Sequence, residues 1–466
     1  MEKLIIAIVV IIVLGISIVL FSKTSGTLNP GKLNIVSYVF YIFMLQSFVG
    51  ASLIALGFDQ HYTLTYLLDA EKSIMTTVIM VWLTAILLPL FILIWQKVFR
   101  YNAKEVYSKF LSSRVEKVKR SKELESLFSI GVVVCLIISA GYLRQVGYIP
   151  ILKLFSAPEG FSFATERVRI SNISFIHPYI SNITLFTIVP LMTYISFSYA
   201  LSYKTGLWRM LFIICFVMSC ICKTYKFEKT PLIFHFVIFV LIYIFYKGGI
   251  KFIHMVLFGM NLVLLLLLSY VATGYEGNLL DIYNGPLGRT FFTEVGTLSY
   301  HFDLFPEVFG YLHGRSFSPS ILTILGIGAE RHIRSAKLVM AFYGSEKVYD
   351  GIAGVMNTLF IGEAYANWGC LGVMFGIVWV AFVISFFMWI VVKMKKTPSS
   401  MTLLAVMSVR MGSMLEGGFC DFVYSFDILF TSIALISVYI LFESSNNFKE
   451  RNKHIRLNRR KGKQDV

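Results

Sequence analysis

Long uncharged hydrophobic runs recur along this chain, and they constrain its fold more than any other feature. A helix needs about 20 consecutive apolar residues to cross the hydrocarbon core of a bilayer. Hydrophobic residues make up 57% of the 466 residues and charged residues only 15%, whereas a soluble domain carries about 25% charged residues. The sequence therefore predicts an all-α integral membrane protein, because a helix satisfies its backbone hydrogen bonds within one segment.

Length and hydropathy predict about eleven transmembrane helices in one polytopic domain over residues 1–442. The expected spans are residues 4–21, 33–56, 74–95, 127–147, 178–201, 208–223, 231–247, 251–271, 370–393, 401–418 and 425–442. No internal repeat or interrupted helix is clearly visible in the pattern. The hydrophobic run at the N-terminus is longer than a signal-peptide core and has no small-residue cleavage site after it, so we expect it to stay as an anchor.

Lysines and arginines in the connections predict the orientation of these spans. They are concentrated at 97–126, at 393–396 and in a basic tail at 443–466. Because short basic loops stay in the cytoplasm, we expect the C-terminus inside, the N-terminus outside, and large outer loops at about 143–177 and 272–369. The net charge of +16 is then a topology signal, and no nucleic-acid partner is expected.

Two groups of cations lie on predicted outer connections between early spans. Arg167 and Arg169 in the first outer loop could clamp a diphosphate with paired hydrogen bonds; the alternative is that they reach toward lipid headgroups. Lys226 lies in a short outer turn between Lys223 and Lys229. Outer lysines run against the positive-inside rule, so either an anionic ligand uses them or the topology simply tolerates them.

The segment 272–369 is the longest polar interruption and contains most of the candidate residues. Arg289 and Arg315 are candidates for binding an anion, and His301 and His313 are candidates for proton transfer near neutral pH. A single histidine is more often a structural polar residue than a catalytic one.

Residues 319–344 are expected to be helical, with Arg331, Arg334 and Lys337 on one face at a spacing of three. The alternative to a binding role is an interfacial helix with solvated charges.

Arg410 falls within a predicted span, where an arginine costs about 2.5–3.5 kcal/mol on insertion scales. It must therefore meet a partner, with Glu416 and Asp421 as structural candidates, or line the floor of a site.

Several common catalytic motifs are missing from the sequence. It contains no Asp-x-Asp pair, no nucleotide-phosphate loop and no Gly-x-Ser-x-Gly elbow. Carboxylates are not clustered and the six cysteines lie in or beside apolar runs, so neither a metal nor another cofactor is expected. What remains is charge neutralisation by arginine together with an acid/base side chain.

Two segments resemble a known family. Residues 362–373 read Gly-Glu-Ala-Tyr-Ala-Asn-Trp-Gly-Cys-Leu-Gly-Val and resemble the Gly-Glu-x-Tyr-x-Asn-Phe-Gly-x-x-Gly-Val segment of bacterial O-antigen and oligosaccharide repeat-unit polymerases (Wzy type). Residues 309–317 are similar to the Phe-x-x-Gly-x-Ser stretch of the same family. The likeness covers most of the chain as a layout, and Trp368 stands where the family has phenylalanine.

The resemblance implies an inverting, metal-independent glycosyltransferase with a GT-C-like architecture in the bacterial cytoplasmic (inner) membrane. It would join oligosaccharide repeat units carried on undecaprenyl diphosphate into a surface polysaccharide, O-antigen or capsule, on the outer side. Arg167, Arg169, Arg289 and Arg315 would neutralise the diphosphate. One of His301, His313 or Glu363 would take the hydroxyl proton.

The same resemblance implies a chain-length regulator and a flippase of the same pathway as partners, together with membrane lipid. Two other functions stay open at this point: an O-antigen ligase-type transferase, and a lipid-linked oligosaccharide flippase or other transporter.

Overall fold

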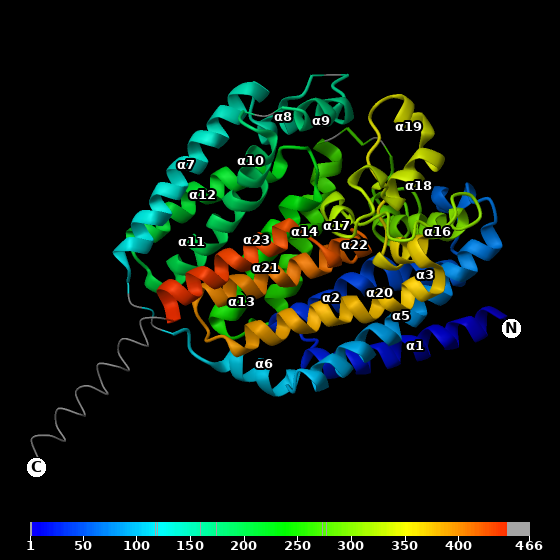
Figure 1. The fold of residues 1–466 in the computed structure, drawn as a ribbon, viewed down its shortest axis with the longest axis horizontal. Helices are drawn as coiled ribbons and strands as arrows, with labels where there is room; N and C mark the ends of the chain where they lie inside the picture. The colour runs from blue at the N-terminus through cyan, green and yellow to red at the C-terminus, as the bar shows by residue number, and fades with distance from the viewer. Residues whose placement is uncertain are drawn as a thin grey trace, which may run out of the picture. The chain divides into compact units, whose positions relative to one another are not determined.

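The computed structural model describes residues 2–444 except 117, 119, 159, 174, 273 and 276. These residues form helices and connections, with no strand in the described part of the chain (Figure 1). Ten helices there are long and apolar enough to cross a membrane, which confirms an all-α, multi-pass membrane protein. The predicted basic tail lies outside the described residues from 445 onward.

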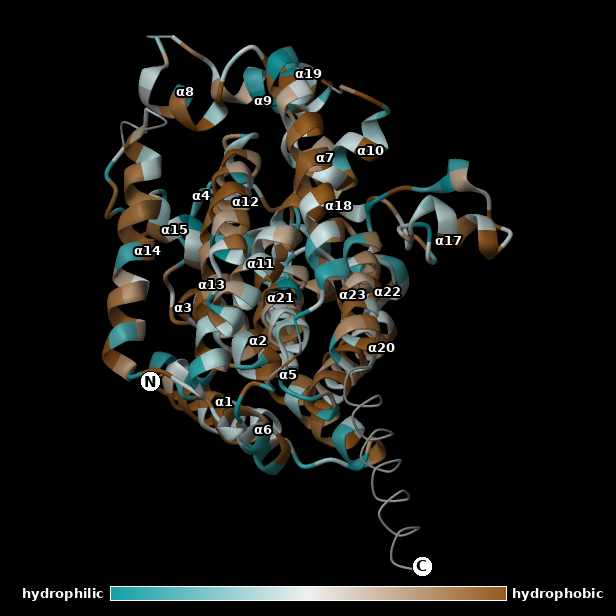
Figure 2. Cartoon of the chain, turned by 90° about the vertical axis from the view of Figure 1, so that its left-hand side faces the viewer, coloured by the Kyte–Doolittle hydropathy of each residue, from teal (hydrophilic) through white to brown (hydrophobic). Residues whose placement is uncertain are grey.

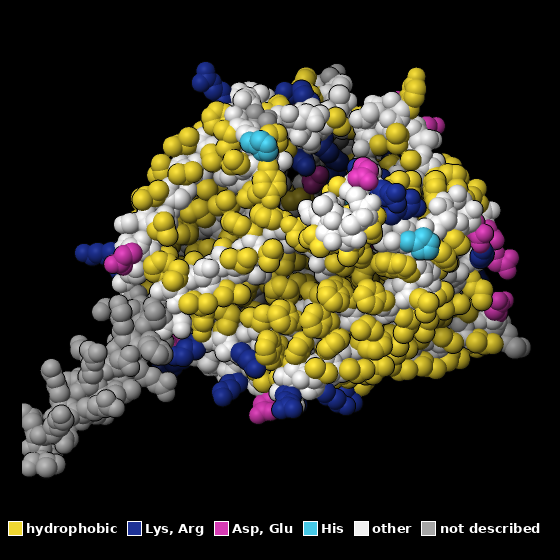
Figure 3. All heavy atoms as spheres, in the orientation of Figure 1, with side chains coloured by type: hydrophobic (Ala, Val, Ile, Leu, Met, Phe, Trp, Pro, Cys, Tyr) yellow, Lys and Arg dark blue, Asp and Glu magenta, His cyan; other side chains and the backbone are white. Residues whose placement is uncertain are grey.

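The ten candidate spans match the predicted pattern closely. They are Glu2–Lys32, Ile35–Ala55, Ala70–Val98, Lys122–Leu154, Pro178–Tyr203, Gly206–Thr224, Thr230–Lys247, Phe252–Ala272, Phe360–Lys393 and Phe419–Ser444. The span expected at 401–418 corresponds to α21 (Pro398–Met414), which has 17 residues and is not one of the ten. Hydrophobic residues dominate the long helices in Figure 2. Hydrophobic side chains cover much of the face in Figure 3, where lysines and arginines lie near the edges and in the upper half.

One boundary differs from the prediction in a way that matters for the site. The span expected at 370–393 begins ten residues earlier, since α20 covers Phe360–Lys393. Its geometry is non-helical at Trp368 and Gly369, an interruption that the hydropathy pattern did not reveal. The segment 360–369 therefore belongs to a helix, and the connection between α14 (Phe252–Ala272) and α20 is 273–359.

The described chain forms two compact units. The first unit comprises Met1–Lys109, Ile250–Val392 and Met407–Ser425, and the second comprises Phe110–Gly249, Lys393–Val406 and Phe426–Val466.

In the first unit, α1 (Glu2–Ser25) and α16 (Thr293–Leu304) both pack against α5 (Ala70–Val98). Every residue of α16 from Val295 to Leu304 is buried. The Asp303 carboxylate accepts hydrogen bonds from the backbone N–H groups of Leu68 and Asp69 at 2.8 and 3.0 Å, and from Ser73 Oγ at 2.8 Å. Part of the connection 273–359 is therefore core of this unit.

The rest of that connection is a series of short helices. They are α15 (Pro286–Phe291), α17 (Pro319–Ile324), η4 (Ala329–Arg331), α18 (Ser335–Tyr343) and α19 (Ser345–Tyr349). The single helix expected over 319–344 is thus wrong. The chain leaves helical geometry after Ile324, where Gly326 and Gly328 take φ of +70° and +95°, so Arg331 and Arg334 do not share one helical face.

The second unit contains α7 (Lys122–Val146), α8 (Pro150–Ser156), α9 (Phe163–Ser171), α10 (Pro178–Ile183), η3 (Thr184–Ile188), α11 (Val189–Tyr203), α12 (Gly206–Thr224), α13 (Thr230–Lys247), α23 (Phe426–Val438) and η5 (Tyr439–Ser444). Its α11 packs along α12. Glu443, at the end of η5, is buried and accepts hydrogen bonds from Tyr199 Oη at 2.6 Å and Ser399 Oγ at 2.9 Å.

Candidate functional site

A cavity of about 610 Å³ lies within the first unit, among α4 (Tyr62–Thr65), α15, α16, α18 and α19. Its lining combines opposite charges with tyrosine rings. The charged side chains are Arg289, Glu294, Glu346 and Lys347, and the tyrosines are Tyr62, Tyr66, Tyr300 and Tyr343. A concave site with a few convergent polar groups among aromatic side chains is typical of small-molecule binding.

Arg289 is held at this cavity by the close packing of its helix. Arg289 is part of α15, which packs closely against α3 (Val49–Ala55). If Gly50 of α3 carried a Cβ atom, that atom would lie 1.8 Å from the carbonyl oxygen of Phe291 in α15. The arginine itself is exposed to the cavity. Burial, with the positive charge of Arg289 added, lowers the pKa of the neighbouring His61 to about 4, so His61 is neutral at pH 7.

Glu294 lies five positions after Arg289, in the first turn of α16, and lines the same cavity. Its Oε2 is shielded from solvent and has no hydrogen-bond partner among the described residues. Burial raises the pKa of Glu294 to about 8, because the charged form is disfavoured away from water. A carboxyl group in this state can exchange a proton near neutral pH.

Sequence reasoning missed Glu294 because it looked for histidines in this segment. The available signal was a carboxylate five residues after Arg289. The tyrosines of the cavity were also missed, since Tyr62 and Tyr66 come from the connection before α5 and meet α16 only in three dimensions.

The tyrosines differ in how freely they face the cavity. Tyr62 and Tyr66 are exposed, whereas Tyr300 stacks on Tyr343 with ring centroids 3.7 Å apart. The Tyr343 hydroxyl also donates a hydrogen bond to Asp303. One side of the cavity is therefore a fixed aromatic wall and the other carries two solvent-facing rings.

The two segments on which the family resemblance rests lie against each other in the first unit. Asn367 is fully buried, accepts a hydrogen bond from Gly314 N at 2.8 Å, and donates to Ser316 Oγ at 2.5 Å and to the Glu363 carbonyl at 2.8 Å. Gly369 has φ +62° and ψ −148°, a conformation that is essentially restricted to glycine. The presence of Asn367 is therefore explained by its hydrogen bonds, and that of Gly369 by its backbone conformation.

Glu363 and Arg334, two of the predicted site residues, belong to the same neighbourhood. Glu363 is 2% exposed and its Oε2 accepts from Cys420 N at 2.9 Å, whereas its Oε1 has no partner within the described chain. Arg334 donates to the Gly417 carbonyl at 2.6 Å and pairs with Asp421 at 3.4 Å. Asp421 thus forms its salt bridge with Arg334, whereas the sequence analysis named Asp421 as a candidate partner of Arg410.

His301, the first predicted proton-transfer residue, is fully buried in α16. Its Nδ1 lies 2.8 Å from the Thr297 carbonyl oxygen, so Nδ1 carries the proton and Nε2 accepts from Ser335 Oγ at 3.2 Å. Burial lowers the pKa of His301 to about 4. Both ring nitrogens are occupied by protein groups, which favours a structural role.

The other candidates of the first unit lie away from the cavity lining. His313 and Arg315 are exposed on the turn after α16, and Arg315 Nε donates to the Leu312 carbonyl at 3.1 Å. Arg331 is exposed in η4, and Arg410 is partly buried in the C-terminal part of α21.

In the second unit, Arg167 and Lys226 lie side by side, since Arg167 Nε donates to the Lys226 carbonyl at 3.1 Å. Arg169 is engaged by Glu166, with both carboxylate oxygens 2.9 Å from its Nε. The predicted pair of arginines is therefore divided, with Arg167 near Lys226 and Arg169 held in an ion pair.

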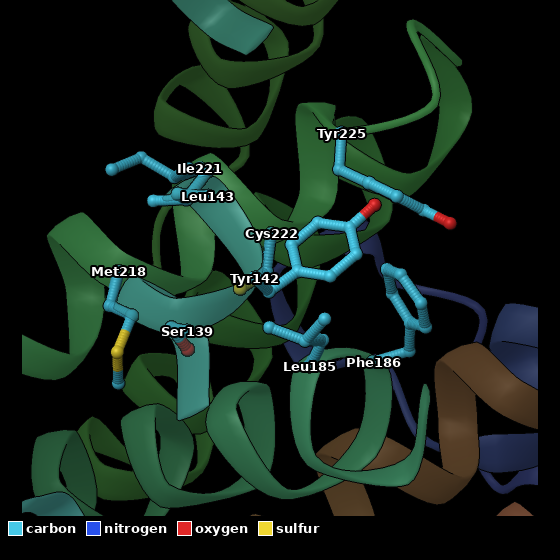
Figure 4. A pocket seen from close by; sticks show the side chains of 9 residues that line it. All are labelled: Ser139, Tyr142, Leu143, Leu185, Phe186, Met218, Ile221, Cys222 and Tyr225. Atoms are coloured by element: carbon cyan, nitrogen blue, oxygen red, sulfur yellow. The ribbon is translucent and has the colours of Figure 1, made fainter. Parts of the chain in front are cut away.

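Lys226 lies beside a small apolar pocket of the second unit, shown in Figure 4. Its Nζ is 5.8 Å from the centre of the Phe186 ring and 5.7 Å from that of Tyr225. Both rings line the pocket, and Figure 4 shows them on one side of it with Met218 on the other. The pocket has a volume of only about 20 Å³, which is too small for a lipid chain.

Within the described residues, no three His, Cys, Asp or Glu side chains are grouped so that they could hold a metal ion. No protein-family model matches the chain, and comparisons with curated proteins and with solved structures give no significant match.

Proposed function

We propose that this protein is a polysaccharide polymerase of the bacterial cytoplasmic membrane, with a GT-C-like architecture and the cavity of the first unit facing outward. It would transfer a glycan from undecaprenyl diphosphate to a sugar hydroxyl of another lipid-linked repeat unit. The observation that carries the proposal is the cavity of about 610 Å³, in which Arg289, Glu294 and tyrosine rings converge within a multi-pass membrane protein. The family resemblance of residues 309–317 and 362–373 supports it.

The reaction needs two functions from the protein. The hydroxyl oxygen of the acceptor attacks the anomeric carbon of the donor, and the bond from that carbon to the diphosphate oxygen breaks with its electron pair. Arg289 would stabilise the negative charge that grows on the leaving diphosphate. The proton of the attacking hydroxyl would go to a base, and the tyrosines would pack against the sugar rings.

Glu294 is the best-placed base. It lines the cavity together with Arg289. Burial raises the pKa of its carboxyl group toward the operating pH, where general bases are most effective; the nearby Glu416 carboxyl interacts with it electrostatically. His301 has both ring nitrogens engaged by protein groups. His313 and Glu363 remain alternatives that lie outside the cavity lining.

Residues of the second unit suit a supporting role. Arg167 and Lys226 would bind lipid-linked phosphate, because the two cationic residues are neighbours. A flippase is a partner that the proposal requires, since the enzyme must receive its repeat units on the outer leaflet. A chain-length regulator is a further partner that the family resemblance implies.

The test is deletion of the gene followed by electrophoresis of the surface glycan. We expect single-repeat caps and loss of the ladder, and recovery of the ladder by the wild-type chain. Arg289→Ala should fail to restore it, whereas Arg331→Ala, an exposed arginine away from the cavity lining, should restore it. An unaltered ladder after deletion would refute the proposal.

The same strains separate the competing functions. Broken helices such as α20 also occur in transporters, and a flippase defect would leave lipid-linked repeat units on the cytoplasmic leaflet. A ligase defect would leave long polymer on the lipid carrier. Single repeat units that accumulate on the outer leaflet are expected only from loss of the polymerase.

A further inference from the structure

Helix α14 is the least covered of the candidate membrane spans. Only 6% of its most hydrophobic window is buried inside the molecule, and Tyr270 is its one buried residue. In Figure 2 it is hydrophobic along most of its length. Lipid can solvate such a helix, so hydrophobic exposure alone does not indicate a partner.

The exposed residues of α14 include a regular stripe. His254, Leu257, Asn261, Leu264, Leu268 and Val271 are all exposed. Their spacing alternates between three and four, which is the a/d pattern of a left-handed helix pair. The helix presents this seam on one side because side chains at these intervals share a face.

Asn261 occupies the middle of the seam. Its Nδ2 donates to the Leu257 carbonyl at 2.7 Å, and this is the one hydrogen bond that it makes within the described residues. Asn261 is exposed near the middle of the span, and its Oδ1 accepts no hydrogen bond within the described residues. Hydrocarbon offers no hydrogen bonds, so a carboxamide there is stabilised by a polar group of another helix.

We propose that the α14 seam is a homodimer interface, in which Asn261 of one copy hydrogen-bonds with Asn261 of a second copy. A carboxamide is both donor and acceptor, so the same side chain across a twofold axis satisfies it. A single polar residue in an otherwise leucine-rich seam sets the register of such a pair. The interface is independent of the proposed enzymatic function.

Cysteine cross-linking in the full-length chain tests the interface. Leu264→Cys lies on the seam, and Val263→Cys lies off it, about 100° further round α14. The two wild-type residues are similarly exposed, at 53% and 55%. Both variants should carry Cys370→Ser, because Cys370 is exposed. We expect a disulfide-linked dimer from Leu264→Cys on mild oxidation in native membranes and little from Val263→Cys.

A second variant tests the role of the carboxamide. Asn261→Leu keeps α14 apolar and should weaken dimerisation in proteoliposomes about tenfold, measured by energy transfer between labelled copies at increasing dilution in lipid. Val263→Leu is the matched control and should leave dimerisation unchanged. Any one of four results would overturn the proposal. They are equal cross-linking at positions 263 and 264, no effect of Asn261→Leu, a monomer in lipid, and cross-linking to a different protein in place of a second copy.

Discussion

Truncation of Asn367 to alanine should destabilise the first unit more than removal of any one of its hydrogen-bond partners. The fully buried carboxamide makes three hydrogen bonds, to Gly314 N, Ser316 Oγ and the Glu363 carbonyl. Together they tie the turn after α16 to the break in α20.

The magnitude follows from these contacts. A hydrogen bond contributes roughly 0.5–1.5 kcal/mol net, and a buried group left without a partner costs about 1–3 kcal/mol. Asn367→Ala removes all three bonds and leaves the buried Gly314 N–H without its acceptor, so the expected loss is about 3–5 kcal/mol. Ser316→Ala removes the hydroxyl but leaves the other two bonds of Asn367, so its expected loss is about 1–2 kcal/mol.

The assay is the free energy of unfolding from titration with a denaturing detergent in mixed micelles, for the wild type and both variants. Asn367→Asp is an informative third variant, because a carboxylate can still accept from Gly314 N but cannot donate to the Glu363 carbonyl. Because that carboxylate would be fully buried and would face the Glu363 carbonyl oxygen, we expect Asn367→Asp to be at least as destabilising as Asn367→Ala at neutral pH. An Asn367→Ala protein as stable as Ser316→Ala would show that the carboxamide does not hold the two segments together.

Three further predictions concern the cavity and its supports. If Glu294 is the base, the polymerisation rate should rise with pH through about 8, since only the carboxylate form accepts a proton. Glu294→Gln should abolish the activity and, with it, this rise of the rate with pH. Gly50→Ala places a methyl group 1.8 Å from the Phe291 carbonyl oxygen and should cost about 1–3 kcal/mol of stability through overpacking. The control is Gly15→Ala, whose Cβ meets nothing within 4 Å. Equal unfolding free energies for the two variants would contradict the close approach of α15 to Gly50. Burial acts to raise the pKa of Asp303, but hydrogen bonds from Tyr343, from two backbone N–H groups and from Ser73 outweigh it and lower the pKa overall. The stabilisation by the Asp303 carboxylate is therefore complete above its unfolded-state pKa of about 3.9 and is lost as pH falls through the lower folded-state pKa. Asp303→Asn should consequently lose less stability than the wild type on acidification below about pH 4. Parallel pH dependences of the two unfolding free energies would refute this.

Most of the membrane architecture could be predicted from the sequence, because crossing a bilayer demands long apolar runs whatever their neighbours are. The short span at 208–223 is a helix (α12, Gly206–Thr224). The start of α20 was misplaced, because Glu363, Asn367 and Gly369 made residues 360–369 look like the end of a polar loop. In the structure, Asn367 is buried and hydrogen-bonded to Gly314 N, and Gly369 has a backbone conformation that favours glycine.

The candidate site was predictable only in part. Arg289 was predicted as a candidate for binding an anion, and it does line the cavity. His301 looked equally suitable, yet whether a histidine is reactive depends on what surrounds its ring, and here Thr297 and Ser335 occupy both nitrogens.

The sequence by itself determined that this chain is a helical membrane protein, since hydropathy and helix length act locally along the chain. Only the tertiary structure decided which polar residues meet. Tyr62 and Glu294 are more than two hundred positions apart, and the packing of α16 against the start of α5 brings them to one cavity. That arrangement depends on close contacts between distant segments, which no local pattern of residues encodes.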